Sequence, residues 1–490
     1  MQGKRHGGGL FVLVLLVLVG CGQRSVDPQA SLSAFAEHLD TRVPALMERY
    51  DVPGVSMALV RDGKRVWTGA YGVADQEAER PMTVDALFRV ESISKPVTAW
   101  GVMTLVEAGR IDLDAPVARY LDTWTFPASP YEEEAVTVRQ LLSHTAGLGM
   151  GALGNEYRPG EELPALRPYL SREVRLVQPP GSAFSYSNAG FDLLELLVES
   201  VTERDFAGYQ AEAVLRPLGM RRAQFGWVDS LFTATPMGYD RAGSPVPLYV
   251  YPGNGAGGLF ADVGDIARFA EATVADAGRR AVLSDSSVRA MHTPQVTVPG
   301  LYGVVTDAYG LGHFVETLPS GHRAVWHGGQ GHGWMTHVHM VPATGDALVV
   351  LTNSERSWPL MAQLLTDWGR WSGVGAVKMG RITTATTVLW GMIAVVGVGT
   401  LWIAGRLVWG LRSGRRRWGP LARTRRVARL GMAIIGIGVL VALGWAAAQP
   451  YLTLTSVFPV AADWAARSLL IASVVLVASA LFPRRSEKSL

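Results

Sequence analysis

The chain has 490 residues, 48% of them hydrophobic, and a formal net charge of +3, and this length allows two or three domains. The charge is divided unevenly, because residues 376–490 carry 15 Lys/Arg and 2 Asp/Glu, whereas residues 1–375 carry 30 and 40. An acidic body lacks the basic face that phosphate binding needs, and we therefore predict that the protein has no nucleic-acid partner.

The N-terminal segment has the features of a bacterial export signal. A basic start precedes an apolar run at 10–19, which is too short to span a bilayer of ~30 Å. The run ends in Leu-Val-Gly-Cys, which resembles a lipobox, and Cys21 is the only cysteine of the chain. We predict a lipoprotein-type signal peptide at 1–21, lipidation of Cys21 and a tether at 22–30. Plain signal cleavage near this point is the alternative.

Strand patterns at both ends of the body enclose a helical middle. Apolar residues recur at helical spacing over 31–50, and two β-rich runs then flank Asp62-Gly63, the turn signal of a hairpin. The middle, 96–290, is mainly helical with long Gly/Pro loops. Strands return at 309–318, 323–329, 334–342 and 347–353, before a closing helix at 359–371. This order predicts an α/β (α+β) fold in which one sheet is assembled from both chain ends, with an inserted helical lobe and a cleft between them.

Ser92 and Lys95 form an S-x-x-K pair ahead of an apolar run. Such pairs arise by chance in a long chain, so the neighbouring sequence has to show whether this pair is catalytic. Residues 96–109 are apolar nearly all round, which predicts a buried helix, and Pro96 fits only in its first turn. The serine and its backbone N–H would then lie at the positive end of the helix, where a desolvated lysine can take the serine proton. The alternative is a serine cap beside a lysine that reaches solvent.

Several segments in order along the chain resemble the class C β-lactamase-like serine hydrolases. This family also includes D,D-peptidases and S-x-x-K esterases. The similar segments are 88–121, 137–148, 179–199, 215–220, 256–269 and 325–334. The resemblance covers roughly 31–370 and implies a β-lactamase/transpeptidase-like fold, with an antiparallel sheet flanked by helices and no cofactor. We therefore predict a hydrolase domain at 31–375.

The resemblance also implies a role for each matched residue. Ser92 would be the nucleophile that forms an acyl-enzyme, and Lys95 would assist its deprotonation. Tyr186 would be the general base or a proton relay, which needs a nearby cation because a phenol titrates near 10. Asn188 would position substrate amide groups. His327 takes the place of the lysine in the family's Lys-Thr-Gly strand motif.

The segment His327-Gly328-Gly329-Gln330 departs from the pattern of true class C β-lactamases. A histidine replaces a fixed positive charge by a titratable one, which weakens the prediction of β-lactamase activity. Gly328 and Gly329 belong to the predicted substrate-binding strand. The backbone N–H of Gln330 would be the second oxyanion donor, beside the backbone N–H of Ser92.

Other chemistry-bearing patterns have weaker support. Residues 253–258 match G-x-G-x-x-G without the strand–helix context of a dinucleotide site, and we interpret them as a flexible loop near the cleft. His337 and His339 share a strand face, but no carboxylate motif accompanies them, and we predict no metal site. We interpret His144 as structural rather than as part of a catalytic triad. We interpret Glu91 as a solvated or loop-bonding carboxylate rather than as a base.

Apolar runs near the C-terminus predict a transmembrane tail at 381–483. We expect three helices, at about 382–405, 430–448 and 462–482. The connecting loop 406–429 contains nine Arg, and such loops stay in the cytoplasm. The basic C-terminal end belongs on the same side. The body would therefore lie on the extracytoplasmic face of the bacterial cytoplasmic membrane.

These observations together predict a membrane-anchored serine hydrolase. Its substrates would be cell-wall D-amino-acid peptides, as for a D,D-carboxypeptidase or endopeptidase, or small esters and amides. The alternatives are a β-lactamase, or a membrane sensor of penicillin or muropeptides whose acyl-enzyme is long-lived. The expected partners are a small-molecule or peptidoglycan-derived substrate and the membrane. The sequence leaves the oligomeric state open.

Overall fold

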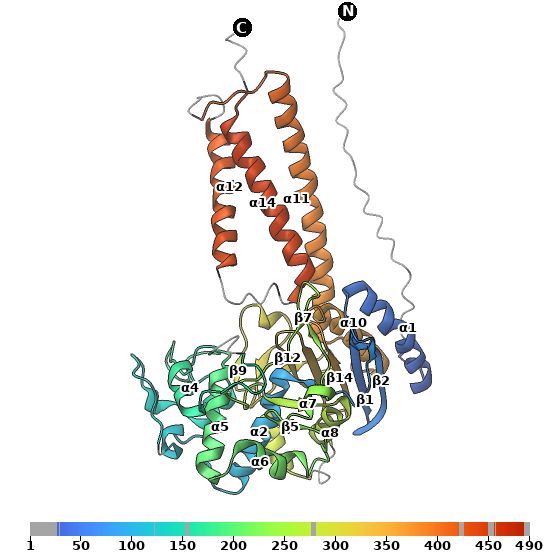
Figure 1. The fold of residues 1–490 in the computed structure, drawn as a ribbon, viewed down its shortest axis with the longest axis vertical. Helices are drawn as coiled ribbons and strands as arrows, with labels where there is room; N and C mark the ends of the chain where they lie inside the picture. The colour runs from blue at the N-terminus through green and yellow to red at the C-terminus, as the bar shows by residue number, and fades with distance from the viewer. Residues whose placement is uncertain are drawn as a thin grey trace, which may run out of the picture.

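The long helices near the C-terminus rise from one side of the body (Figure 1). The computed structural model describes residues 27–28, 30–121, 123–151, 156–275, 281–420, 426–448, 455 and 457–484. The predicted signal peptide, the lipidation site Cys21 and most of the tether lie outside the described residues.

A large sheet forms the centre of the body. Among the described residues its strands are β1 (Gly54–Arg61), β2 (Lys64–Asp75), β3 (Arg80–Pro81), β9 (Val296–Thr297), β10 (Ala308–Tyr309), β11 (Phe314–Thr317), β12 (Arg323–Gln330), β13 (Met335–Val341) and β14 (Asp346–Thr352). Their order is β3-β2-β1-β14-β13-β12-β11-β10-β9, and all pairings are antiparallel. The predicted hairpin is β1–β2, and β1 also pairs with β14 from Val55↔Thr352 to Val60↔Ala347. The sheet is thus assembled from both ends of the body, as predicted.

The strand predicted at 309–318 is wrong, because this segment forms two short strands, β10 and β11. Between them the chain turns, and the N–H of Gly310 donates to the carbonyl of His313 at 2.8 Å. Gly312 has a φ of +81°, and a Cβ there would come within 2.6 Å of the Ala99 side chain. The chain passes directly over the buried helix that contains Ala99, and only a glycine fits at this contact. The turn at Gly312 follows from this close approach.

Two helices cover one face of the sheet. They are α1 (Leu32–Tyr50), as predicted, and α10 (Trp358–Ser372). Val55, Met57 and Leu59 of β1 belong to the apolar cluster beneath them. The rings of Phe35 and Trp371 stack 4.3 Å apart and join the two helices. The alternation of strand side chains therefore gives each face its own core.

The helical lobe covers the opposite face. Its helices are α2 (Ser94–Glu107), α3 (Val138–Leu142), α4 (Leu166–Glu173), α5 (Asn188–Thr202), α6 (Phe206–Gln210), α7 (Leu231–Ala234), α8 (Val263–Val274) and α9 (Asp285–Met291). The small strands β4 (Phe88–Arg89), β8 (Leu259–Ala261) and β5 (Gln224–Phe225) form a separate sheet in that order, and β6 (Gly238–Tyr239) pairs with β7 (Pro245–Val246).

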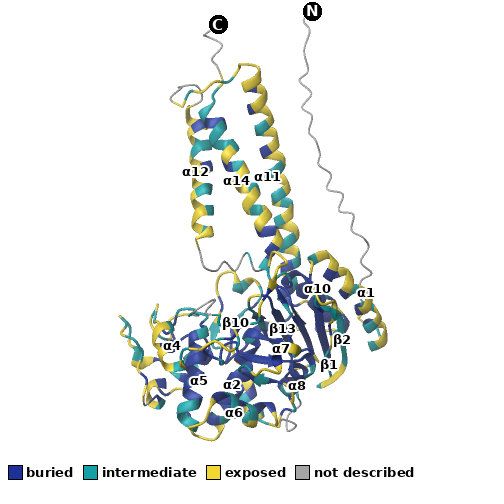
Figure 2. Cartoon of the chain, in the orientation of Figure 1, coloured by how far each residue is buried: buried dark blue, intermediate teal, exposed yellow. Residues whose placement is uncertain are grey.

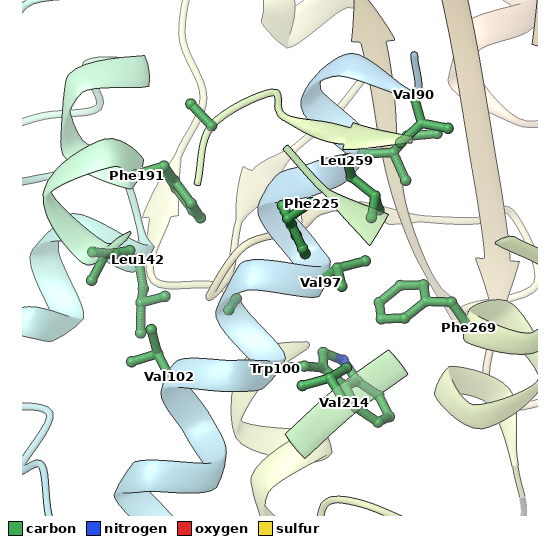
Figure 3. Packing of buried hydrophobic residues seen from close by; sticks show 14 of the residues in the cluster. Val90, Val97, Trp100, Val102, Leu142, Phe191, Val214, Phe225, Leu259 and Phe269 are labelled. Atoms are coloured by element: carbon green, nitrogen blue, oxygen red, sulfur yellow. The ribbon is translucent and has the colours of Figure 1, made fainter. Parts of the chain in front are cut away.

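Helix α2 runs through the middle of the lobe, and it is buried along most of its length, as its apolar sequence predicts. Figure 3 shows Val97, Trp100 and Val102 of this helix among apolar side chains of neighbouring elements. The ring of Trp100 meets that of Phe269 on α8 edge-on at 5.3 Å. This packing fixes the start of α2, where Ser92 and Lys95 lie.

Within the described part of the apolar tail, three helices are long and apolar enough to cross a membrane. They are α11 (Arg381–Arg412), α12 (Arg426–Ala447) and α14 (Pro459–Leu481), and few of their residues are buried (Figure 2). Arg416 forms a β-bridge with Arg484, and Arg429 Nε donates to the carbonyl of Ala480 at 2.7 Å. The Arg-rich loop and the end of α14 therefore lie at the same end of the helices.

We predict that Phe269→Ala lowers the free energy of unfolding by about 3–5 kcal/mol, because it opens a cavity against Trp100 in a fully buried cluster. The matched change Phe232→Ala, at a side chain that is 67% exposed, should alter it by less than about 0.5 kcal/mol. Urea unfolding of the full chain in detergent, followed by tryptophan fluorescence, measures both. Equal effects of the two changes would contradict this description of the core.

Candidate active site

The segment before α2 is fixed by backbone and hydroxyl hydrogen bonds. The N–H of Val90 donates to the carbonyl of Leu259 at 3.1 Å, which continues the pairing of β4 with β8. Residues Glu91–Ile93 form one turn of 3-10 helix, and α2 follows from Ser94. The hydroxyl of Ser94 donates to the carbonyl of Glu91 at 2.6 Å and accepts the N–H of Leu259 at 3.0 Å. Ser92 is thus held at the helix start, as predicted.

Glu91 is a loop-bonding carboxylate rather than a solvated one, so the second of its two interpretations is confirmed. The residue is 2% exposed, and its carboxylate accepts from Arg89 Nε at 2.9 Å. The hydroxyls of Tyr249 and Tyr251 donate to its two oxygens, each at 3.1 Å. Its backbone has a φ of +52°, which is uncommon for a residue with a side chain. The buried ion pair and the two tyrosines bond Glu91 to a neighbouring loop and hold this strained residue directly before Ser92.

Lys95 and Ser92 are hydrogen-bonded, as their spacing predicts. Lys95 Nζ donates to Ser92 Oγ at 2.9 Å, to Asn188 Oδ1 at 2.8 Å and to the carbonyl of Ala256 at 2.9 Å. The lysine has no exposed surface. When Lys95 is protonated, these three acceptors match the three N–H donors of its ammonium group.

Burial controls the protonation of this lysine. Desolvation lowers the pKa of Lys95 to about 7, although the carboxylates of Asp192 and Glu91 act in the opposite direction. Burial also raises the pKa of Asp192 to about 6, against the effect of Lys95. Asp192 accepts the N–H of Ala256 at 3.1 Å. This bond helps to hold the loop that contains Ala256, whose carbonyl accepts from Lys95. Sequence reasoning missed Asp192, although a carboxylate within the apolar run of α5 was the available signal.

The Gly-rich loop 253–258 lies beside Lys95, near the cleft as expected, and residues of α5 bond to it. Glu195, also on α5 and buried, accepts the N–H of Gly255 at 2.7 Å and Nδ2 of Asn254 at 3.2 Å. Burial, together with the neighbouring Asp192, raises the pKa of Glu195 to about 8. The loop thus bonds to Lys95 on one side and to α5 on the other.

Tyr186 and His144 form an aromatic wall beside the lysine. Lys95 Nζ lies 4.9 Å from the centroid of the Tyr186 ring. The His144 ring packs 4.3 Å from the same ring, and its Nδ1 accepts the N–H of Ser187 at 3.1 Å. Burial lowers the pKa of His144 well below its usual value, and the charge of Lys95 adds to this effect. These are the contacts of a structural residue that supports Tyr186.

His327 lies on β12 and has no exposed surface. Its Nε2 lies 3.2 Å from the hydroxyl of Tyr309, and its Nδ1 lies 2.9 Å from the carbonyl of Gly328. Burial lowers the pKa of His327 well below its usual value, and Lys95 lowers it further. The expected titratable charge is therefore absent near pH 7, where this imidazole is neutral.

Strand β12 is pressed against the residues that precede Ser92. A Cβ on Gly329 would lie 2.1 Å from the carbonyl oxygen of Val90, so only glycine permits this approach. Thr336 of β13 donates its hydroxyl to the same carbonyl at 2.7 Å, a contact that sequence reasoning missed because the two residues are far apart in the chain. The contact brings Gln330 and Ser92 to one cavity.

Most of the predicted site residues line this cavity. They are Ser92, Tyr186, Asn188, His327, Gly328 and Gln330. Lys95 and Gly329 lie behind its wall, where they support Ser92 and β12. The remainder of the wall is apolar and includes Phe314, Trp326 and Trp358.

His337 and His339 lie deeper in the sheet. Their nearest ring nitrogens are 3.3 Å apart, and both side chains are buried. Among the described residues, no group of three or more His, Cys, Asp or Glu side chains is arranged to hold a metal ion.

The fold and the site together define a class of protein. A serine hydrogen-bonded to a buried lysine, at a helix start beside an antiparallel sheet, is the arrangement of a serine hydrolase with the β-lactamase/transpeptidase fold. Residues 39–365 match the family model described as Beta-lactamase, and the chain belongs to this family.

Two curated relatives and one solved structure illustrate the range of the family. Esterase EstB of Burkholderia gladioli is 30% identical, over 67% of this chain and 94% of the esterase. A D-aminopeptidase of Brucella anthropi is also 30% identical, over 62% of this chain but only 55% of that enzyme. The octameric penicillin-binding protein homologue from Pyrococcus abyssi has a TM-score of 0.57 and 26% identity, over 67% of this chain and 77% of that structure.

We predict that Gly329→Ala lowers kcat for p-nitrophenyl acetate on the order of 10²-fold, because a methyl group would push β12 away from Val90 and displace Gln330 from Ser92. Gly405→Ala, where a Cβ on α11 meets nothing within 4 Å, is the matched control and should leave kcat unchanged. Circular dichroism of both variants separates a local displacement from loss of the fold. An active Gly329→Ala variant would show that the close approach is dispensable.

Proposed function

We propose that the protein hydrolyses esters or amides through an acyl-enzyme formed on Ser92. The observation that carries this proposal is the 2.9 Å hydrogen bond between Ser92 Oγ and the fully buried amine of Lys95. The serine also lies at the start of the buried helix α2, where the helix dipole favours developing negative charge.

In the proposed reaction, neutral Lys95 takes the proton of Ser92 as the oxygen attacks the carbonyl carbon of the substrate. Tyr186, whose ring borders Lys95, relays the proton to the leaving alcohol or amine. The backbone N–H groups of Ser92 and Gln330 hold the oxyanion, since both residues line the same cavity. Water then attacks the ester on Ser92 and releases the acid. Asn188, which bonds Lys95, keeps the amine directed at Ser92.

The uncharged wall of the cavity favours esters and amides over substrates that carry a carboxylate near the scissile bond. No charged side chain is among the described residues that line the cavity. The nearest amine, that of Lys95, is already bonded to three partners, and His327 is neutral. A peptide ending in D-alanine, or a β-lactam, would leave its carboxylate without a fixed partner there. Cell-wall peptides and β-lactams are therefore the second choice.

We also propose that residues 31–375 act as the hydrolase domain and that the tail anchors it in the cytoplasmic membrane. The nine Arg of the loop 406–429 favour a cytoplasmic position for that loop, and the body then lies on the extracytoplasmic face. Arg484, which forms a β-bridge with Arg416 of this loop, fits the same orientation. A lipid on Cys21 would attach the chain to the same face.

We predict that Ser92→Ala abolishes turnover of a substrate panel by the full chain in detergent, whereas Ser320→Ala, in an exposed turn, retains it. The panel contains p-nitrophenyl acetate, a D-Ala-D-Ala peptide and nitrocefin, and we expect the acetate to be the best substrate. A stable label from fluorescent penicillin without any turnover would instead support a sensor. Turnover that survives in Ser92→Ala would contradict the proposed nucleophile.

We predict that kcat/KM for p-nitrophenyl acetate rises as the pH increases through about 7. Below this value Lys95 is an ammonium ion and cannot accept the proton, whereas above it the amine is neutral. Lys95→Arg keeps the charge at every pH and should lower kcat by about 10²–10⁴-fold without this rise. A pH–rate profile from 5 to 9 for both proteins measures the effect. A flat profile for the unmodified protein would exclude Lys95 as the titrating base.

A further inference from the structure

The cavity in front of Ser92 extends to the base of the apolar tail. Beyond the site residues its wall is formed by the loop 301–305, by Met379 just before α11, by Ile382 and Ala385 at the start of α11, and by Val457 and Phe458 just before α14. Figure 1 shows α11 and α14 rising together from this side of the body, next to α10. One continuous space therefore joins the reactive serine to the entrance of the first membrane helix.

The base of the tail is packed as part of the body. Met379, Ile382 and Phe458 are buried in the same apolar cluster as Trp326 and Trp358, which line the cavity. Polar contacts fix the junction further. The N–H of Lys378 donates to Glu316 at 2.8 Å, its amine pairs with Asp307, and Arg381 donates to the carbonyl of Val304 at 3.0 Å. The wall formed by the tail is thus set in position by the sheet.

The cavity has one polar end and one apolar end. Its polar groups gather around Ser92, where Asn188, His327 and Gln330 lie, whereas every side chain contributed by α11 and by residues 457–458 is apolar. Such a wall binds a hydrocarbon chain with a gain of roughly fourfold per buried methylene group. Its apolar side chains form no hydrogen bonds with the polar backbone of a peptide.

A second cavity meets Ser92 from another side and is polar. Ser92, Asn188 and Gln330 line both cavities, and the second one adds Glu91, Tyr169, Asp192 and Tyr251. A substrate carbonyl at Ser92 would therefore have an apolar space for its acyl group and a polar space for its leaving group. An amphiphilic substrate, with an apolar acyl chain and a polar headgroup, would fit these two spaces.

The apolar end opens where the chain enters the predicted membrane region. Ile382 and Ala385 belong to the first two turns of α11, at the start of the uncharged run 382–405. Leu301 and Val304, which line the same end, are 40% and 39% exposed, so apolar surface continues outside the cavity. An acyl chain could pass along this surface from the bilayer without crossing water.

We propose that the site hydrolyses a membrane-resident lipid, whose long acyl chain enters between α11, residues 457–458 and the loop 301–305. This inference rests on the proposed function. Ser92 Oγ bonds to the acyl carbon, the bond from that carbon to the headgroup oxygen or nitrogen breaks, and the headgroup leaves with the serine proton. Water then cleaves the Ser92 ester and releases the fatty acid, which returns to the bilayer.

The test uses the full chain reconstituted in phosphatidylcholine vesicles with two probes. One is p-nitrophenyl palmitate held in the bilayer, and the other is water-soluble p-nitrophenyl acetate. We expect kcat/KM for the palmitate to exceed that for the acetate by at least about tenfold. We expect the palmitate rate to follow the mole fraction of ester in the bilayer rather than its total concentration.

Ala385→Phe narrows the apolar end and should lower the palmitate-to-acetate ratio by about tenfold or more. Ala394→Phe, an exposed position higher on the same helix, is the matched control and should leave the ratio unchanged. Leu301→Asp places a charge beside the opening on a partly exposed loop, and it provides the same readout if Ala385→Phe does not fold. It should lower the ratio as well.

The outcomes are separable. Acetate turnover that depends on Ser92, without preference for the palmitate or without an effect of the cavity variants, overturns this inference and leaves the proposed function intact. If the palmitate rate follows the total ester concentration, the substrate enters the site from water, and this result overturns delivery of the acyl chain from the bilayer. No Ser92-dependent turnover of either probe overturns both proposals.

Discussion

The amine of Lys95 has no contact with solvent, and much of the site is arranged around that constraint. A buried ammonium group is costly unless acceptors surround it, and Ser92, Asn188 and the carbonyl of Ala256 supply them. The Gly-rich loop that carries Ala256 is itself held by Asp192 and Glu195 of α5. The same burial that requires these bonds lowers the pKa of the lysine to about 7, where it can exchange a proton near neutral pH.

A second constraint is the close approach of β12 to the start of α2. The body joins a sheet to a helical lobe, and the reactive serine belongs to the lobe whereas Gln330 belongs to the sheet. Only a glycine at 329 lets the strand touch the carbonyl of Val90, and the hydroxyl of Thr336 bonds the same atom. The strained backbone of Glu91, held by Arg89 and two tyrosines, lies between these contacts and Ser92. Local strain is thus compensated by buried polar contacts.

The base of the tail forms part of the cavity wall in front of Ser92. In the body alone, the cavity would end at the loop 301–305 and the aromatic wall of Phe314, Trp326 and Trp358. The first turns of α11 and the residues before α14 extend this wall with further apolar side chains. Their burial in the cluster of the sheet means that the position of the tail and the shape of the cavity depend on the same packing.

Local patterns in the sequence were sufficient for the hairpin at Asp62-Gly63, the buried helix behind Ser92, the sheet built from both ends and the three apolar spans, because each depends on periodicity or composition. The turn within 309–318 was predicted wrongly, and the bonds from Tyr249 and Tyr251 to Glu91 were not predicted, because each depends on an element distant in the chain. Asp192, Thr336 and the cavity wall from α11 were missed for the same reason. The sequence by itself determined which groups could react, through residue type and spacing. Only the tertiary structure decided their protonation and what can reach them, because desolvation and cavity shape depend on segments that meet only when the chain folds.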